Sequence, residues 1–236
     1  MKKVITLFYR DFSSLFFSPV AYIVLTFFLL ISGYFFSVIL ASLQQAGLRY
    51  TLANMAITLL FISPMLTMRL LAEEKRSGTI ECLLTDPVTD LEVVLAKFSA
   101  ALAFYLVLLL PTLFYVLILK IVGNPDMGPI LSGYLGLFLL GSVFISIGLF
   151  ASSLTKNQIV AAVISLVTLL LLWVIGWSGE STASSWGKVT GYLSILNHFE
   201  GFRKGIIDTR DVFYYLTTTI LFLFLTVRTV ESRKWK

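Results

Sequence analysis

The sequence has little charge, one cysteine and one histidine. Only 13% of its 236 residues are charged and 58% are hydrophobic, with a mean hydropathy of +0.91. A soluble domain carries roughly 25% charged residues, so a water-soluble fold is excluded. Cys82 cannot form an intrachain disulfide, and with His198 alone it cannot build a His/Cys metal cluster. We therefore expect no metal site and no redox chemistry.

Six apolar runs also lack internal ionisable residues. A transmembrane helix needs about 20 apolar residues, so six would use roughly 120 and leave too few for a separate soluble domain. The fold class expected is an all-α polytopic membrane protein in which residues 1–236 form a single transmembrane domain. Pro64 and Pro111 lie inside two of the runs and predict kinks there. The predicted spans are residues 19–41, 52–68, 98–119, 130–154, 159–178 and 212–227.

The basic residues predict the orientation. With both termini in the cytoplasm, 12 of the 18 Lys and Arg residues lie on the inner side, as the positive-inside rule requires. The net charge of +5 is thereby explained without a nucleic-acid partner. Residues 1–18 are not a cleavable signal, because Arg10 and Asp11 interrupt the apolar run. Their hydrophobic spacing predicts an amphipathic helix lying at the inner surface.

Residues 69–97 form the only sizeable inner loop, and it holds ten of the 31 formal charges. Gly78 permits a sharp break, residues 79–84 are long enough for a short helix, and Asp86-Pro87 predicts a turn. Thr89 and Glu92 have the spacing of a capping box, so a helix should begin there and continue into the third span. The loop is therefore expected to fold as helix, turn and helix.

The long outer segment, residues 179–211, contains a second amphipathic stretch. Its apolar residues recur at helical spacing from Trp186 to Phe202, which predicts an interfacial helix. Asp208 is placed to cap the last span.

Three other kinds of chemistry have partial signals in the sequence. The segment Gly123–Gly128 is followed by Pro129 where a phosphate-binding loop needs lysine, so this chain is not expected to hydrolyse ATP. Gly176-Trp177-Ser178-Gly179 matches the pattern around the nucleophile of intramembrane serine proteases, but only His198 could activate it, from the outer segment. An ion-coupled carrier or channel normally has ionisable residues inside its spans. The two prolines leave a broken-helix version of that class open.

The sequence does not decide the role of two features of the spans, their small residues and the aromatic residues of the first span. Small residues at four-residue spacing can pack spans within one subunit or form a dimer seam. Aromatic residues of the first span can line a path, although lipid contact is the commoner role. The small residues are Gly33, Ser37, Ala41, Ser142 and Ser146, and the aromatic residues are Phe27, Phe28, Tyr34, Phe35 and Phe36.

The inner loop resembles that of a known family. The stretch from Arg69 to Val88, RLLAEEKRSGTIECLLTDPV, is similar to the loop after the second span in permeases of type-2 ABC transporters. The shared pattern is an acidic-basic run, Gly-Thr, Glu, apolar residues and Pro-Val, and Cys82 departs from the apolar residue expected there. The stretch Asn197–Asp211 is similar to gliding-motility-associated and to copper-processing (nitrous-oxide-reductase-associated) permeases, more so to the former.

The resemblance implies a permease subunit of an exporter in the bacterial cytoplasmic membrane. Two permease chains, identical or paralogous, would pair and bind two ABC ATPase subunits, with the path between them lined by the first, second and fifth spans. ATP would bind the partner, with no cofactor on this chain. Membrane lipid and an accessory extracytoplasmic protein are further expected partners, and nucleic acid is not. The residues implied as the ATPase interface are Glu73, Glu74, Lys75, Arg76, Gly78, Thr79, Glu81, Asp86 and Pro87.

Overall fold

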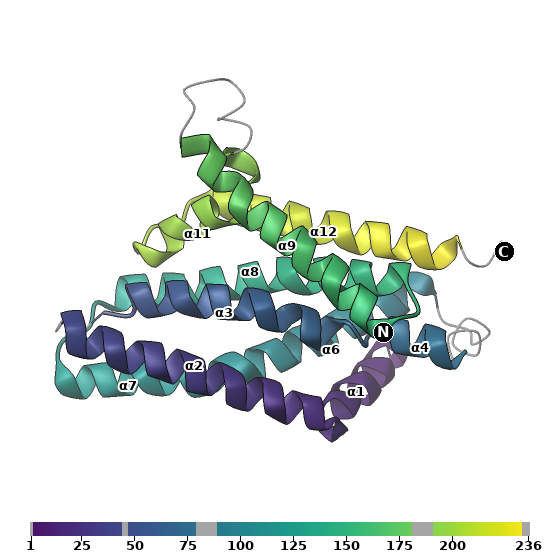
Figure 1. The fold of residues 1–236 in the computed structure, drawn as a ribbon, viewed down its shortest axis with the longest axis horizontal. Coiled ribbons are helices and arrows are strands. Elements are labelled where there is room, and N and C mark those ends of the chain that lie inside the picture. The colour runs from purple at the N-terminus through teal and green to yellow at the C-terminus, as the bar shows by residue number, and fades with distance from the viewer. Residues whose placement is uncertain (1, 44–46, 79–88, 181–190, 233–236) are drawn as a thin grey trace.

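The protein is an elongated bundle of helices, and its first and last described residues lie toward the same end of the bundle (Figure 1). This computed structural model describes residues 2–43, 47–78, 89–180 and 191–232. Within those ranges every regular element is helical, and six helical segments are long and apolar enough to cross a membrane. The all-helical, six-span prediction is therefore confirmed.

The helices extend the predicted spans at most ends. The third shows this most clearly, because it begins at Asp90 rather than residue 98. Thr89 caps it by accepting from the Glu92 N–H, while the Glu92 carboxylate accepts from the Thr89 N–H. The predicted capping box is therefore confirmed. The elements are α1 (Lys2–Phe17), α2 (Pro19–Leu43), α3 (Arg49–Thr67), α4 (Ala72–Ser77), α6 (Asp90–Leu109), η1 (Leu110–Thr112), α7 (Leu113–Val122), α8 (Met127–Leu154), α9 (Gln158–Glu180), α11 (Ile195–Arg203) and α12 (Thr209–Glu231).

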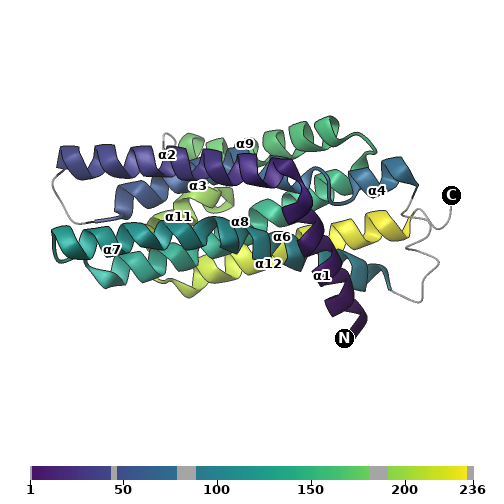
Figure 2. The same ribbon diagram turned by 90° about the horizontal axis from the view of Figure 1, so that it is seen from below.

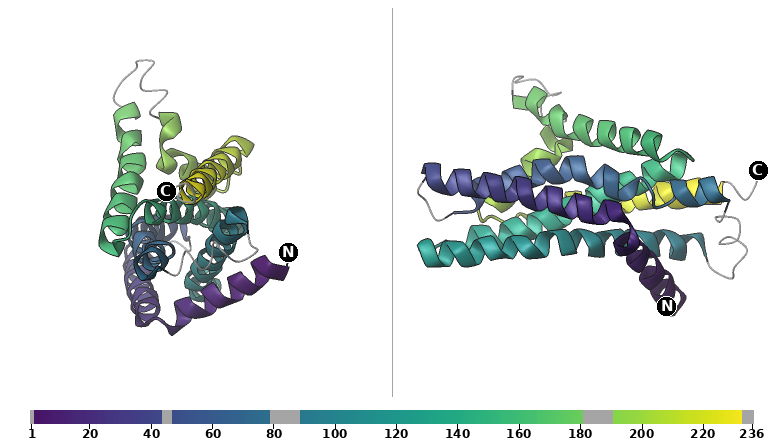
Figure 3. Two further views of the ribbon diagram at one scale, coloured as in Figure 1. Left: turned by 90° about the vertical axis from the view of Figure 1, so that its right-hand side faces the viewer. Right: turned by 60° about the horizontal axis from the view of Figure 1, so that its bottom comes forward.

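Helix α1 is the predicted amphipathic helix, and it runs across one end of the bundle rather than along it (Figure 2 and Figure 3). Its apolar face is half-buried, whereas Arg10 and Ser13 on the other side are exposed. The Phe16 ring meets Phe104 of α6 edge-on, with centroids 5.2 Å apart. Pro19 then opens α2, at a position where the missing N–H costs no helical hydrogen bond.

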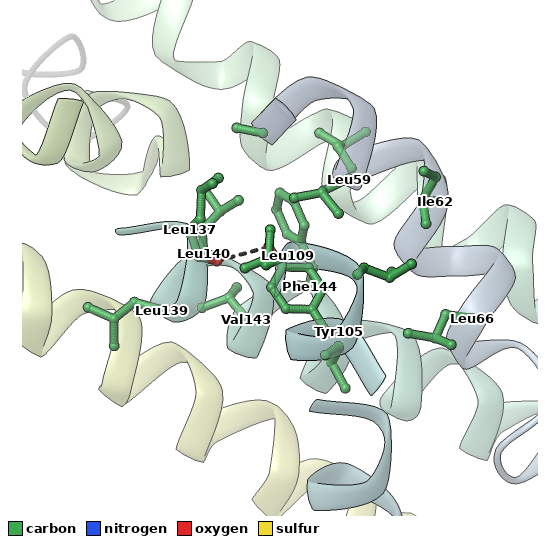
Figure 4. Close-up of a cluster of buried hydrophobic side chains, with 14 of the residues drawn as sticks. Leu59, Ile62, Leu66, Tyr105, Leu109, Leu137, Leu139, Leu140, Val143 and Phe144 are labelled. Atoms are coloured by element: carbon green, nitrogen blue, oxygen red, sulfur yellow. Dashed lines mark hydrogen bonds between the residues drawn. The ribbon is translucent and has the colours of Figure 1, made fainter. Parts of the chain in front are cut away.

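Helix α8 is the centre of the bundle and contacts α3, α6, α9, α11 and α12. Glycines on its surface let neighbours approach closely. A Cβ added at Gly136 would lie 2.7 Å from the Phe202 Cβ, and one at Gly141 would overlap the Tyr105 ring. Because lipid tails are as apolar as leucine, such close packing is what holds transmembrane helices together. Figure 4 shows the core where α3, α6 and α8 meet, including the hydrogen bond from the Tyr105 hydroxyl to the Leu137 carbonyl, 2.9 Å.

The two prolines act differently. Pro111 lies in a short 3-10 segment that separates α6 from α7, so the third span changes its winding where the sequence predicts a kink. Pro64 lies near the end of α3, which remains α-helical through it and ends at Thr67. A proline so close to a helix end leaves little helix beyond it to redirect.

Within the predicted amphipathic stretch, α11 is a helix over Ile195–Arg203, and Phe199 and Phe202 are buried in the bundle. Its place at a membrane interface stays a prediction. Trp186 and Val189 lie outside the described residues. The Ser132 hydroxyl of α8 donates to the Phe202 carbonyl at 2.7 Å. Gly205, with a φ of 89°, turns the chain toward α12, which Asp208 caps as predicted.

Some of the small and aromatic residues singled out in the first span pack within the subunit, and others are exposed on its surface. Gly33 faces the Tyr115 hydroxyl of α7, and Phe36 stacks on the Tyr115 ring with centroids 4.5 Å apart. Phe28 is fully buried, whereas Phe27 and Tyr34 are exposed. The first span therefore uses part of its aromatic content for packing within the subunit.

Candidate functional site

The described first part of the charged loop, residues 69–78, lies toward the bundle end that also carries α1 and the described end of α12 (Figure 1). This part contains α4, which follows α3 after a short turn. α4 ends at Gly78, where a φ of 76° confirms the predicted break. Residues 79–88 lie outside the described residues, and with them the predicted helix over 79–84 and the turn at Asp86-Pro87.

One serine of α8 fixes the start of α4. The Ser152 hydroxyl accepts from the N–H groups of Leu71 and Ala72, both at 3.0 Å, and donates to the Met68 carbonyl at 3.1 Å. A hydroxyl has one donor and two acceptor sites, so all three are used. The first N–H groups of a helix have no partner within it, and here a neighbouring span supplies one.

A lysine attaches the other side of α4 to the same helix end. The Lys75 ammonium, which is 3% exposed, donates to the Ser153 carbonyl. This carbonyl lies in the last turn of α8, where the helix dipole favours a positive charge. Together with Ser152, this contact makes α4 move with α8.

A buried ion cluster joins α4 to α1 and α6. The Lys97 ammonium of α6 lies 2.7 Å from Glu74 Oε1 and 3.4 Å from Asp11 Oδ2. Arg10 of α1 reaches the same two carboxylates, at 3.4 Å and 2.9 Å respectively. The Lys97 side chain is only 4% exposed, and a charge buried that deeply is tolerated when it is paired. Three helices that are distant in sequence therefore share one electrostatic junction.

The predicted interface residues therefore divide into two groups. Glu73, Arg76 and Gly78 are exposed, whereas Lys75 is buried and Glu74 is largely covered within the ion cluster. Thr79, Glu81, Asp86 and Pro87 lie outside the described residues. Their role as an interface stays a prediction.

Sequence reasoning missed the residues that position α4. In the sequence, Arg10 and Asp11 only interrupt an apolar run, and Lys97 is only the last residue before a predicted span. That interruption was the available signal, because a charge that becomes buried needs a partner. Ser152 carries no comparable signal, since serine is common in transmembrane helices.

His198, the candidate base of the protease alternative, is held in a different arrangement. Its Nδ1 lies 2.6 Å from Asp211 Oδ1, its Nε2 lies 2.9 Å from the Tyr192 carbonyl, and its ring stacks on Tyr214 at 4.0 Å. The Nδ1 contact links α11 to α12, whereas Nε2 contacts the chain just before α11, so both ring nitrogens are engaged. The side chain of Ser178 lies outside the described part of the structure.

The exposed end of α11 carries a second charge cluster. Lys204 lies 2.9 Å from Glu200, and Arg203 lies 3.3 Å from it. The hydrogen bond from Lys204 lowers the pKa of Glu200 below its usual range, and the charges around it add to this effect. Glu200 is therefore ionised at neutral pH and helps hold the last turn of α11.

Comparison with known proteins places the chain in a family. The sequence profile described as ABC-2 family transporter protein matches residues 40–230 of the 236, a range that runs from the end of α2 to near the end of α12. No match was found among curated proteins. Permeases of this family act with ABC ATPase subunits and typically lack an ATPase domain of their own. The chain is therefore a multi-pass membrane protein that belongs to the ABC-2 transporter family as its membrane component.

Proposed function

We propose that this chain is the permease subunit of an ABC exporter, driven by separate ATPase subunits through the loop of residues 69–97. The observation that carries the proposal is the two-sided character of α4. α4 is attached to α8, α1 and α6, whereas Glu73 and Arg76 are exposed, Glu73 at the edge of the helix that faces Arg69. An exposed, charged surface on a firmly held helix is suited to receive force from a partner.

The attachments define where that force would go. A displacement of α4 acts on α8 through Ser152 and on α6 through Lys97. It also acts on α3, because only a short turn separates the two helices. The opposite face, with Glu73 and Arg76, is the part of the described loop that we assign to the ATPase. Thr79, Glu81, Asp86 and Pro87 are assigned to the same surface on the resemblance alone.

Two copies of the chain, or this chain and a paralogue, are proposed to form the translocation path. Among the six spans, α2 and α9 are the least buried within one chain. Only 22% of the most apolar stretch of each is buried, against 78% in α8. These two helices correspond to the first and fifth spans that the resemblance places along the path. Their uncovered faces support a second chain there, with lipid on the remaining surface.

The remaining assignments follow from the sequence and the resemblance. Both termini are proposed to lie in the cytoplasm of a bacterial cell, with α4 on the same side as the ATPase. ATP is bound by the partner, and an accessory extracytoplasmic protein is proposed at the outer end. The gliding-motility-associated subgroup is our proposal for the nearest relatives, and residues 1–236 are proposed to act as one domain.

Affinity purification of the full chain from membranes tests the proposal. We expect an ABC ATPase subunit to co-purify, and we expect transport in liposomes only when that subunit and ATP are present. A chain that carries solutes alone, without ATP, would be the carrier or channel of the alternative hypothesis. Labelling of Ser178 by a serine-directed probe would instead support the protease.

A further inference from the structure

A cleft of about 590 Å³ opens between α1, the start of α2 and the end of α3. Its two halves differ in chemistry. One half is apolar and is lined by Val20, Val24 and Met65 among others. The other half is lined by three basic and three acidic side chains, namely Arg10, Arg69, Lys97, Asp11, Glu73 and Glu74. The cavity is therefore amphipathic.

The position of the cleft matches the boundary between lipid headgroups and acyl chains. An amphipathic helix such as α1 lies in that boundary, and the apolar span α2 starts at Pro19 beside the cleft. Phe17 is 88% exposed and Met65 is 45% exposed, so apolar side chains at the cleft remain uncovered by the protein. A lipid chain can reach them from the surrounding bilayer.

The charges at the cleft are unequal in how firmly they are held. Lys97, Asp11 and Glu74 are at most 19% exposed within the ion cluster described above, and Arg10, although 48% exposed, contacts both carboxylates. Arg69 and Glu73 form a looser pair, with 3.6 Å between Nε and Oε2 and with 33% and 55% of their side chains exposed. The Ser18 hydroxyl accepts a hydrogen bond from Arg69 Nη1, which keeps the guanidinium over the cleft. This pair is the part of the cleft that can exchange partners.

We propose that the cleft binds one phospholipid with a zwitterionic headgroup that carries a primary ammonium, as in phosphatidylethanolamine. The phosphate binds Arg69, because a planar guanidinium presents paired donors to phosphate oxygens. The ammonium donates to Glu73, and an acyl chain lies over Met65 and Phe17, two apolar side chains of the cleft that are exposed. The six charged side chains sum to zero, so a neutral dipolar headgroup complements them better than an anionic one.

The test is lipid retention by the full chain, purified with any subunits that stay bound and measured by native mass spectrometry. The protein is mixed with equal amounts of phosphatidylethanolamine, phosphatidylglycerol and phosphatidylcholine. We expect one phosphatidylethanolamine to be retained in preference, since choline has no N–H to donate. Equal retention of the three lipids, or a preference for phosphatidylglycerol, would overturn the proposal.

Matched variants locate the site. Arg69→Gln should lower the bound fraction of phosphatidylethanolamine about tenfold, and Glu73→Gln should remove the preference over phosphatidylglycerol. Arg228→Gln is the control, because Arg228 is an exposed arginine paired with Glu231 on α12, and it should retain lipid as the native chain does. An equal loss in this control would show general surface binding and would overturn the proposal.

A second kind of variant guards against misfolding of the charge variants. Met65→Trp fills the apolar half of the cleft at an exposed position and leaves all six charges in place. It should also lower phosphatidylethanolamine retention. Undiminished retention in a well-folded Met65→Trp protein would contradict the proposed place of the acyl chain.

Discussion

Among single residues, Lys97 depends most on its surroundings, because it is a buried charge. Its ammonium is removed from water, and its charge is balanced by Asp11 and Glu74 on two other helices. Burying an ion is costly, and removing one partner of a buried cluster leaves the others uncompensated. The stability of the junction therefore depends on all of its members being present.

Lys97→Met should destabilise the protein by about 3–5 kcal/mol, because Asp11 and Glu74 then lose their buried cation and keep only Arg10, whose side chain is 48% exposed. Thermal unfolding in detergent, followed by circular dichroism, measures the change. Lys156→Met is the matched control, since Lys156 is exposed in the turn after α8, and it should change the midpoint little. Equal midpoints for the two variants would mean that the cluster adds no stability.

A second residue-scale prediction concerns the close contact between α8 and α3. A Cβ at Gly148 would overlap the buried Thr67 side chain, whereas one at Gly33 would meet only the Tyr115 hydroxyl at 3.4 Å. Gly148→Ala should therefore destabilise by about 1–3 kcal/mol, as overpacked cores do. Gly33→Ala should be neutral or slightly stabilising, because alanine favours helix. The unfolding midpoints of both variants provide the comparison, and a neutral Gly148→Ala would contradict the contact.

At the scale of elements, α4 is a six-residue helix, too short to persist in isolation. Ser152 and Lys75 attach it to α8, and Glu74 attaches it to α1 and α6. Its order is therefore a property of its neighbours. This explains how a short charged helix can serve as a firm docking surface.

Ser152→Ala removes three hydrogen bonds and leaves two buried N–H groups of the α4 turn without a partner. We expect a loss of about 1–3 kcal/mol and faster amide exchange in α4. Ser146→Ala on the same helix is the control, because the buried Ser146 hydroxyl donates only to Val143 within α8. Hydrogen–deuterium exchange measures both. Unchanged exchange in α4 of the Ser152 variant would show that the cap is dispensable.

Elements were predictable from sequence where their signals are local. The capping box at Thr89 and Glu92, the cap at Asp208 and the break at Gly78 each depend on residues within a few positions of one another. The contact of Ser152 with Leu71 spans 81 positions. No local pattern reports such a contact, because it depends on how two spans pack.

At the scale of the whole molecule, composition predicted the class well. Charge-free apolar runs leave few alternatives to membrane spans, and all six are present among the described helices. The prediction of the ATPase interface was less complete than that of the class, because a single sequence does not show which charged side chains of α4 are buried. Glu74 and Lys75 resemble Glu73 and Arg76 in sequence, yet the packing of α1, α6 and α8 separates them.

The central claim is that the exposed face of α4 receives the force of ATP hydrolysis. The most direct test is transport-coupled ATP turnover of the assembled complex in proteoliposomes, with the charges of Glu73 and Arg76 exchanged (Glu73→Lys with Arg76→Glu). Glu74 is left unchanged because it belongs to the ion cluster. Glu73→Gln alone measures how much of the effect comes from the cleft that Glu73 also lines. The control exchanges the charges of Arg228 and Glu231, an exposed pair on α12.

Both double variants keep the net charge, so insertion and orientation should be unaffected. We expect the α4 exchange to lower coupled ATP turnover about tenfold, because like charges would then face each other at the rim of the interface, and we expect the α12 exchange to leave it unchanged. Native turnover and native transport in a correctly inserted α4 variant would contradict the account.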